Sequence, residues 1–153
     1  MKKRDAIVAA ITIAIMCLPV AIIARKYYQS VNLPSSVFDW TTIKVTPTKT
    51  GERRQFFQSP TATLDELECH VSTLNPGETA HPPHKHPEEE MTIVKDGTVE
   101  VLVNGELKTV GPGSLVFQAA NTMHNIKNVG STQAVYFAIK WKSVKTERPV
   151  KVD

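Results

Sequence analysis

Apolar and polar residues alternate in short runs throughout the chain beyond Trp40. Successive side chains of an extended strand point to opposite faces, so each run predicts a strand with one buried face. The clearest run places Leu67, Cys69 and Val71 on one face, and we expect Glu68 and His70 to point outward. The expected strands span residues 43–45, 54–58, 67–72, 91–94, 98–103, 106–110, 114–117 and 133–141. No segment beyond Trp40 has the apolar period of a helix, so the pattern predicts an all-β antiparallel barrel or sandwich.

Turn residues separate these runs. Asn104-Gly105 stands between residues 98–103 and 106–110, and both turn residues accept a positive φ, so this segment predicts a tight hairpin. Asn75-Pro76-Gly77 and Gly111-Pro112-Gly113 have the composition of turns as well.

The N-terminal segment has a different pattern. Residues 6–24 carry no charge, which is long enough to span the roughly 30 Å hydrocarbon core of a bilayer. We therefore predict an N-terminal hydrophobic helix, a transmembrane anchor or uncleaved signal over residues 1–28. The excess of positive charge before it, at Lys2, Lys3 and Arg4, places the barrel on the extracytoplasmic side. A cleaved secretory signal, which would release the barrel, is the alternative.

The remaining boundaries follow from composition. Residues 29–48 are expected to form a tether, residues 49–143 the barrel and residues 144–153 a charged tail. The net charge of +3 comes from scattered Lys and Arg residues, which argues against a nucleic-acid-binding surface. Two cysteines are too few for a disulfide framework.

A cluster of metal-ligand residue types lies between Gly77 and Gly97. His84 and His86 have equal parity and share a face in an extended chain, and Glu90 joins them if the register resumes beyond Pro87. Two imidazoles and a carboxylate form part of a transition-metal site. His124 is the best-placed candidate for a further ligand.

These residues resemble the two motifs of the cupin superfamily, in its small single-domain form. Gly77, His84, His86, Glu90 and Gly97 follow the first motif with one extra residue after Gly77. The second motif is matched by Gly113, His124 and Asn128 at the expected spacing, whereas Ala119 replaces its Pro and Asn121 its Gly. Because Asn tolerates positive φ, we expect the turn at Asn121 to form.

The resemblance implies a jelly-roll barrel that holds a divalent transition metal through His84, His86, Glu90 and His124. Iron, manganese, nickel, copper and zinc all suit these ligands. It further implies a metal-dependent oxygenase, or an isomerase or lyase, acting on a small organic molecule, with Glu90 as a candidate catalytic base. A homodimer is expected by resemblance alone.

Two alternatives stay open on the sequence. The histidines could line the barrel without a metal, and the chain could be a non-catalytic, membrane-tethered cupin that binds an acid or a sugar. No separate general base is evident near the motifs. We expect His81 to be a loop residue, Glu88 and Glu89 to be solvated, and Asn128 to hold a turn or neighbouring strand by hydrogen bonds.

Overall fold

The computed structural model describes residues 32–144, together with residues 4, 12, 15–20, 22, 23 and 146. The chain divides into two compact units, Met1–Ser35 and Ser36–Asp153, and every strand of the described part lies in the second unit. The second unit also contains all the residues of the candidate site.

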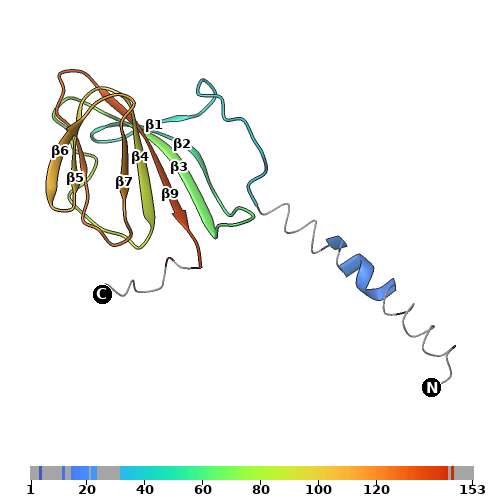
Figure 1. The fold of residues 1–153 in the computed structure, drawn as a ribbon. Coiled ribbons are helices and arrows are strands. Elements are labelled where there is room, and N and C mark those ends of the chain that lie inside the picture. Colours follow the sequence, from blue (N-terminus) through green and yellow to red (C-terminus); the bar gives the residue numbers. More distant parts are fainter. Residues whose placement is uncertain are drawn as a thin grey trace, which may run out of the picture. The chain divides into compact units, whose positions relative to one another are not determined.

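The second unit is built from antiparallel strands in two sheets (Figure 1). The strands are β1 (Val45–Pro47), β2 (Gly51–Ser59), β3 (Glu66–Leu74), β4 (Glu89–Asp96), β5 (Val99–Val103), β6 (Glu106–Val110), β7 (Leu115–Gln118), β8 (Ile126–Asn128) and β9 (Ala134–Lys142). One sheet has the order β1-β2-β3-β9-β4-β7 and the other the order β6-β5-β8. The all-β antiparallel prediction is confirmed. The short strand β8 was not anticipated, because three residues are too few to show an alternation.

The apolar core is shared by the two sheets. Leu74, Val94 and Tyr136 come from the larger sheet, and Val99 and Val101 come from β5 of the smaller one. All five side chains are buried and belong to a single cluster. The two sheets therefore pack against one another through this shared core.

Positive-φ residues occur where the turn chemistry predicts them. Asn104 and Gly105 have φ values of 52° and 80°, as the predicted hairpin between β5 and β6 requires. Asn121 has a φ of 60°, so the turn of the second motif forms with Asn in place of Gly. The expectations for both turns are confirmed.

The assignment of faces in β3 is wrong. His70 and Glu68 line the internal cavity rather than facing solvent, and the side chain of Glu68 is almost completely buried. Cys69 and Val71 lie on the opposite face, which is buried as well. Burial accordingly raises the pKa of the Cys69 thiol to about 11. Both faces of this strand are covered, each by a different part of the chain.

The outer face of the larger sheet is covered by the segment that precedes the barrel. Phe38 packs on Phe57 with ring centroids 5.0 Å apart, and Trp40 packs on Phe56 and Phe137 at 6.2 Å. Because Phe137 alternates with the core residues of β9, these aromatic rings lie outside the barrel core. We call residues 36–44 the aromatic strap.

The folded unit consequently begins before the predicted boundary at residue 49. The aromatic strap and β1, which pairs with β2, both fall within the segment expected to be a tether. The apolar residues of the strap, which alternate poorly, explain why the sequence pattern did not reveal a packed segment there.

The predicted membrane anchor over residues 1–28 lies largely outside the described residues. Within the part of the chain that the structure describes, no helix is long and apolar enough to cross a membrane. Of the predicted tail, only Val144 and Thr146 are described.

Candidate metal centre

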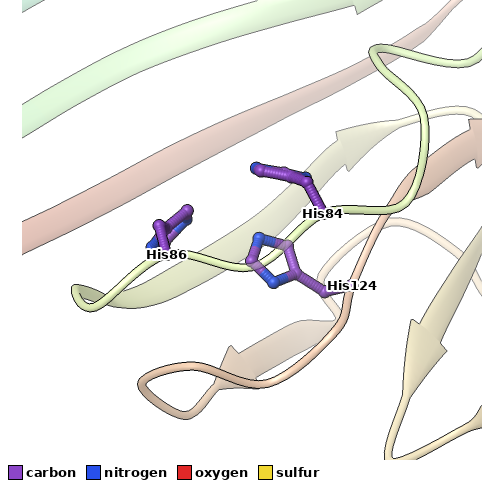
Figure 2. Close-up of side chains that lie close together, drawn as sticks. All are labelled: His84, His86 and His124. Atoms are coloured by element: carbon purple, nitrogen blue, oxygen red, sulfur yellow. The ribbon is translucent and has the colours of Figure 1, made fainter.

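Three histidines converge at one end of the barrel. His84 and His86 precede β4, whereas His124 lies in the loop before β8 (Figure 2). One ring nitrogen of each histidine lies within 4.8 Å of the others, a spacing at which a single ion could contact all three. The structure thus brings together three of the four residues expected to be ligands.

The backbone holds two of these residues side by side. The amide of His84 donates to the carbonyl of His124 at 3.1 Å, and the amide of His124 donates back to His84 at 2.9 Å. This isolated antiparallel bridge joins the two motif segments. Their ring centroids are 4.5 Å apart as a result.

Backbone carbonyls orient two of the rings. Nδ1 of His86 lies 3.0 Å from the carbonyl of Glu88, and Nδ1 of His124 lies 2.8 Å from the carbonyl of Thr122. A carbonyl can only accept, so in each ring Nδ1 carries the proton and Nε2 presents its lone pair. This is how proteins commonly set the tautomer of a metal-binding histidine.

Each of the three rings also has a buried nitrogen without a hydrogen bond in the described part of the chain. Nε2 of His86, Nε2 of His124 and Nδ1 of His84 are buried and make no hydrogen bond with the described residues. A buried polar atom without a hydrogen bond is costly, and a cation bound among these rings would provide a partner for such atoms. The residues present therefore fit the transition metal that the ligand types suggest.

Glu90 stands at the edge of this group. Its Oε2 lies 3.5 Å from Nε2 of His86, an ion-pair distance without hydrogen-bond geometry. This contact raises the pKa of His86 above 6.5. Burial raises the pKa of Glu90, but His86 and His124 outweigh that effect, and the pKa falls below 4.5. Glu90 is thus held as a carboxylate beside the histidines, and its role as a ligand stays a prediction.

His81 and His84 form a second contact at the site. Their ring centroids are 4.0 Å apart, and His81 is exposed in the loop, where it lines the cavity mouth. Burial lowers the pKa of His84, and the neighbouring His81 and His124 lower it further. The imidazole of His84 is therefore favoured in its neutral form, which metal binding requires.

The site opens into a cavity of about 310 Å³. The cavity wall nearest the histidines is a transverse row of polar residues: β3 contributes Glu68, β9 Lys140, β4 Glu90 and β7 Gln118, paired in register. Tyr136, Val101 and Ile126 line other parts of the wall. A small molecule would thus meet charged groups beside the histidines and apolar side chains elsewhere.

Glu68 is the centre of an ion-pair cluster in this row. Its Oε1 accepts from the guanidinium of Arg53 at 2.6 Å and lies 3.1 Å from Nδ1 of His70, and its Oε2 lies 3.2 Å from Nζ of Lys140. The contact with His70 and the charge of Lys140 hold the pKa of Glu68 far below its usual range despite burial. We call Arg53, Glu68, His70 and Lys140 the Glu68 cluster.

Sequence reasoning missed the Glu68 cluster. Its members lie on three strands and form no motif, and in β3 they occupy the polar face that was assigned to solvent. The only signal was an acidic residue and a histidine sharing one parity in β3. That signal is weak, because a solvent-exposed strand face looks the same.

Two further expectations concern motif residues. Asn128 is fully buried, and its amide nitrogen donates to the carbonyls of Leu74 and Thr132 at 2.9 and 2.8 Å. Its expected role in holding a turn and a neighbouring strand is confirmed. Glu88 was expected to be solvated, but it is buried and lies 3.3 Å from Nζ of Lys142. That expectation is wrong.

Comparisons with known proteins agree with this geometry. Residues 70–140 match the family model Cupin_2, a cupin domain. A search of curated proteins found none that matches the chain.

Solved structures share the fold at low identity. KdgF from Halomonas sp. superposes with a TM-score of 0.60 at 19% identity, over 69% of this chain and 94% of that one. An RmlC-like cupin from Shewanella frigidimarina superposes with a TM-score of 0.59 at 16% identity, over 72% of this chain and 95% of that one. The polyketide cyclase RemF from Streptomyces resistomycificus superposes with a TM-score of 0.57 at 17% identity, over 73% of this chain and 86% of that one. At these identities the likeness concerns the fold alone. Residues 70–140 therefore match a cupin domain, and the barrel shares its fold with these solved structures.

Proposed function

We propose that this protein is a metal-dependent enzyme of the single-domain cupin type, which acts on a small organic molecule bound in the barrel cavity. The observation that carries the proposal is the convergence of His84, His86 and His124, whose ring nitrogens lie within 4.8 Å of one another. Each ring also has a buried nitrogen that makes no hydrogen bond among the described residues. Two of these rings already have their tautomers fixed by backbone carbonyls. Such preorganisation supports a dedicated ion site over a chance grouping of histidines.

The proposed reaction class is an isomerisation, elimination or oxygenation. A bound divalent ion would supply Lewis-acid polarisation of a substrate oxygen, and a redox-active ion would permit oxygen chemistry as well. Glu90 would complete the ligand set or act as a base, and its depressed pKa keeps it deprotonated for either role. The cyclase RemF has this fold, which is consistent with catalysis in such a barrel.

The protein also offers a base outside the proposed ligands. His70 lies on the cavity wall with Nδ1 directed at the buried carboxylate of Glu68. A carboxylate that orients an imidazole is a common arrangement for general acid–base work. This observation favours an enzyme over a module that only binds.

The first experiment measures metal in the purified full-length chain by mass spectrometry. We expect about one transition-metal ion per chain, lost in a variant that combines His84→Ala and His124→Ala. His81→Ala is the matched control, because it removes a neighbouring histidine outside the three-residue group. A chain that neither retains nor takes up iron, manganese, nickel, copper or zinc would refute the proposal.

The membrane anchor over residues 1–28, the extracytoplasmic location and the homodimer are further proposals. They rest on the apolar N-terminal run, its flanking charges and the family resemblance. Fractionation of cells expressing the full chain, followed by protease treatment of intact cells, tests the first two. Light scattering of the purified protein tests the third.

A further inference from the structure

We propose that the cavity recognises a small organic anion, and that Arg53 and Lys140 bind its carboxylate while the rest of the molecule faces the three histidines. The inference deepens the proposed function, since it assigns a substrate class to the same cavity. Its basis is the charge of the cavity wall and the way in which those charges are held.

The positive and negative side chains that line the cavity cancel in net charge when no metal is bound. Arg53 and Lys140 are cationic, and Glu68 and Glu90 are anionic. Glu52 also lines the cavity, but it is paired with Arg54 at 2.6 Å. Any divalent ion held by the histidines therefore adds positive charge that no side chain of the wall compensates. A cavity with excess positive charge favours an anionic ligand.

The two cations are arranged for a carboxylate. Both already bind one, because Glu68 accepts from Arg53 through Oε1 and from Lys140 through Oε2. Glu68 is thus shared by both cations, and Glu90 supplies the second negative charge of the wall. The side chains of Arg53 and Lys140 are 40% and 28% exposed, whereas that of Glu68 is only 6% exposed. Glu68 thus holds the cations at the wall while their outer faces remain accessible.

The cations stand close to the proposed metal ligands. Lys140 is paired in register with Glu68 on one side and with Glu90 on the other. A ligand that bridges the histidines and Lys140 would therefore need only a short carbon chain. The cavity volume of about 310 Å³ suits a molecule of this kind.

Two features favour a carboxylate over a neutral sugar or an inorganic anion. A neutral ligand would leave the positive charge of a bound divalent ion uncompensated. Apolar side chains on other parts of the wall, including Val101 and Ile126, would contact the carbon skeleton of an organic anion but not phosphate.

The test is a calorimetric titration of the full-length chain, after its metal content has been measured. The probes are malonate, succinate and glutarate, each compared with its uncharged diamide, and inorganic phosphate. We expect at least one dicarboxylate to bind, its diamide to bind at least tenfold more weakly, and phosphate to bind more weakly than that dicarboxylate.

The variants separate the cations from the metal. Lys140→Gln and Arg53→Gln should each weaken dicarboxylate binding about tenfold or more while metal content stays unchanged, and Lys140→Arg should restore most of the affinity. Lys108→Gln is the matched control, because Lys108 pairs with Glu106 at 3.6 Å on β6 and does not line the cavity. Arg53→Gln changes a partly solvated side chain, so it remains informative if Lys140→Gln fails to fold.

The outcomes distinguish this proposal from the proposed function. Undiminished binding in a folded Lys140→Gln or Arg53→Gln variant overturns the carboxylate site, even if metal is present. Tighter binding of phosphate or of a diamide overturns the ligand class. If no metal binds, the proposed function fails, and the same titration of the metal-free protein decides the anion site: binding that Arg53→Gln weakens supports it, and no binding refutes it.

Discussion

His84 and His124 exchange a reciprocal pair of backbone hydrogen bonds, of 3.1 and 2.9 Å, between the two motif segments. Because these bonds use main-chain groups, the two candidate ligands are adjacent whether or not an ion is bound. We therefore expect the metal-free protein to keep its fold. Circular dichroism after chelation should show the same strand signal. Added metal should raise the free energy of unfolding only as ligand binding does, by about 2.7 kcal/mol at a hundredfold excess over Kd.

Amide hydrogen exchange tests whether the backbone bridge between His84 and His124 depends on bound metal. If metal creates the bridge, the amides of His84 and His124 would lose protection on chelation while the core amides of β9 stay protected. If the bridge precedes the metal, protection at both amides survives.

Gly97 illustrates a glycine that packing requires. It has a φ of 80°, and a Cβ there would lie 2.7 Å from the Cα of Ala134 and from the carbonyl of Gln133. Gly105 has the same φ but nothing within 4 Å. We expect Gly97→Ala to cost about 3 kcal/mol or more, whereas Gly105→Ala should cost about 1 kcal/mol from backbone strain alone. Urea denaturation measures the loss in free energy of unfolding for each variant. Equal losses would show that the backbone near Ala134 shifts to accommodate the added Cβ.

The Glu68 cluster makes the free energy of unfolding depend on pH in the acid range. The pKa of Glu68 in the folded state is depressed, so its contribution is present above its ordinary value of 4.5 and is lost as pH falls towards the folded-state pKa. Glu68→Gln should therefore destabilise the protein at pH 7, by about 2 kcal/mol, because Arg53 and Lys140 remain partly solvated. The variant should also lose stability less steeply between pH 5 and pH 3 (roughly the titration range of carboxylates).

A matched acid variant separates this effect from general charge change. Glu106→Gln removes a carboxylate of an exposed pair on β6, and it should alter neither stability nor acid sensitivity appreciably. Thermal melts of both variants across the pH series measure the slopes. Parallel slopes for Glu68→Gln and the unmodified protein would contradict the depressed pKa.

The aromatic strap should contribute to the stability of the barrel. Trp40 packs on Phe56 and Phe137, and the guanidinium of Arg54 lies 4.8 Å from its ring centroid. We expect Trp40→Ala to reduce the free energy of unfolding by about 2–3 kcal/mol. Val37→Ala is the control, since that side chain is 96% exposed. Equal stability of the two variants would contradict this prediction and would indicate that residues 36–44 act only as a tether.

Much of the site could be predicted from local sequence. The spacing of His84 and His86, the parity of Glu90 and the turn at Asn121 depend on a few neighbouring residues and on backbone geometry, and all can be read without knowing the fold. The pairing of His84 with His124 could not be derived in this way. It depends on which loops meet when the two sheets close. The residue types made His124 a candidate ligand, and the resemblance to known motifs supported it, but neither predicted the backbone pairing.

The sequence by itself determined most of the strands, although not β8, together with the Asn104-Gly105 hairpin and the residue types of the candidate metal centre. Alternation, φ preference and ligand chemistry are local properties. Only the tertiary structure decided which face of β3 is inside. Its apolar face, with Cys69 and Val71, is buried outside the barrel core, and its polar face, with Glu68 and His70, lines the cavity. Alternation distinguishes two faces of a strand, but the elements that cover each face determine which one is the interior.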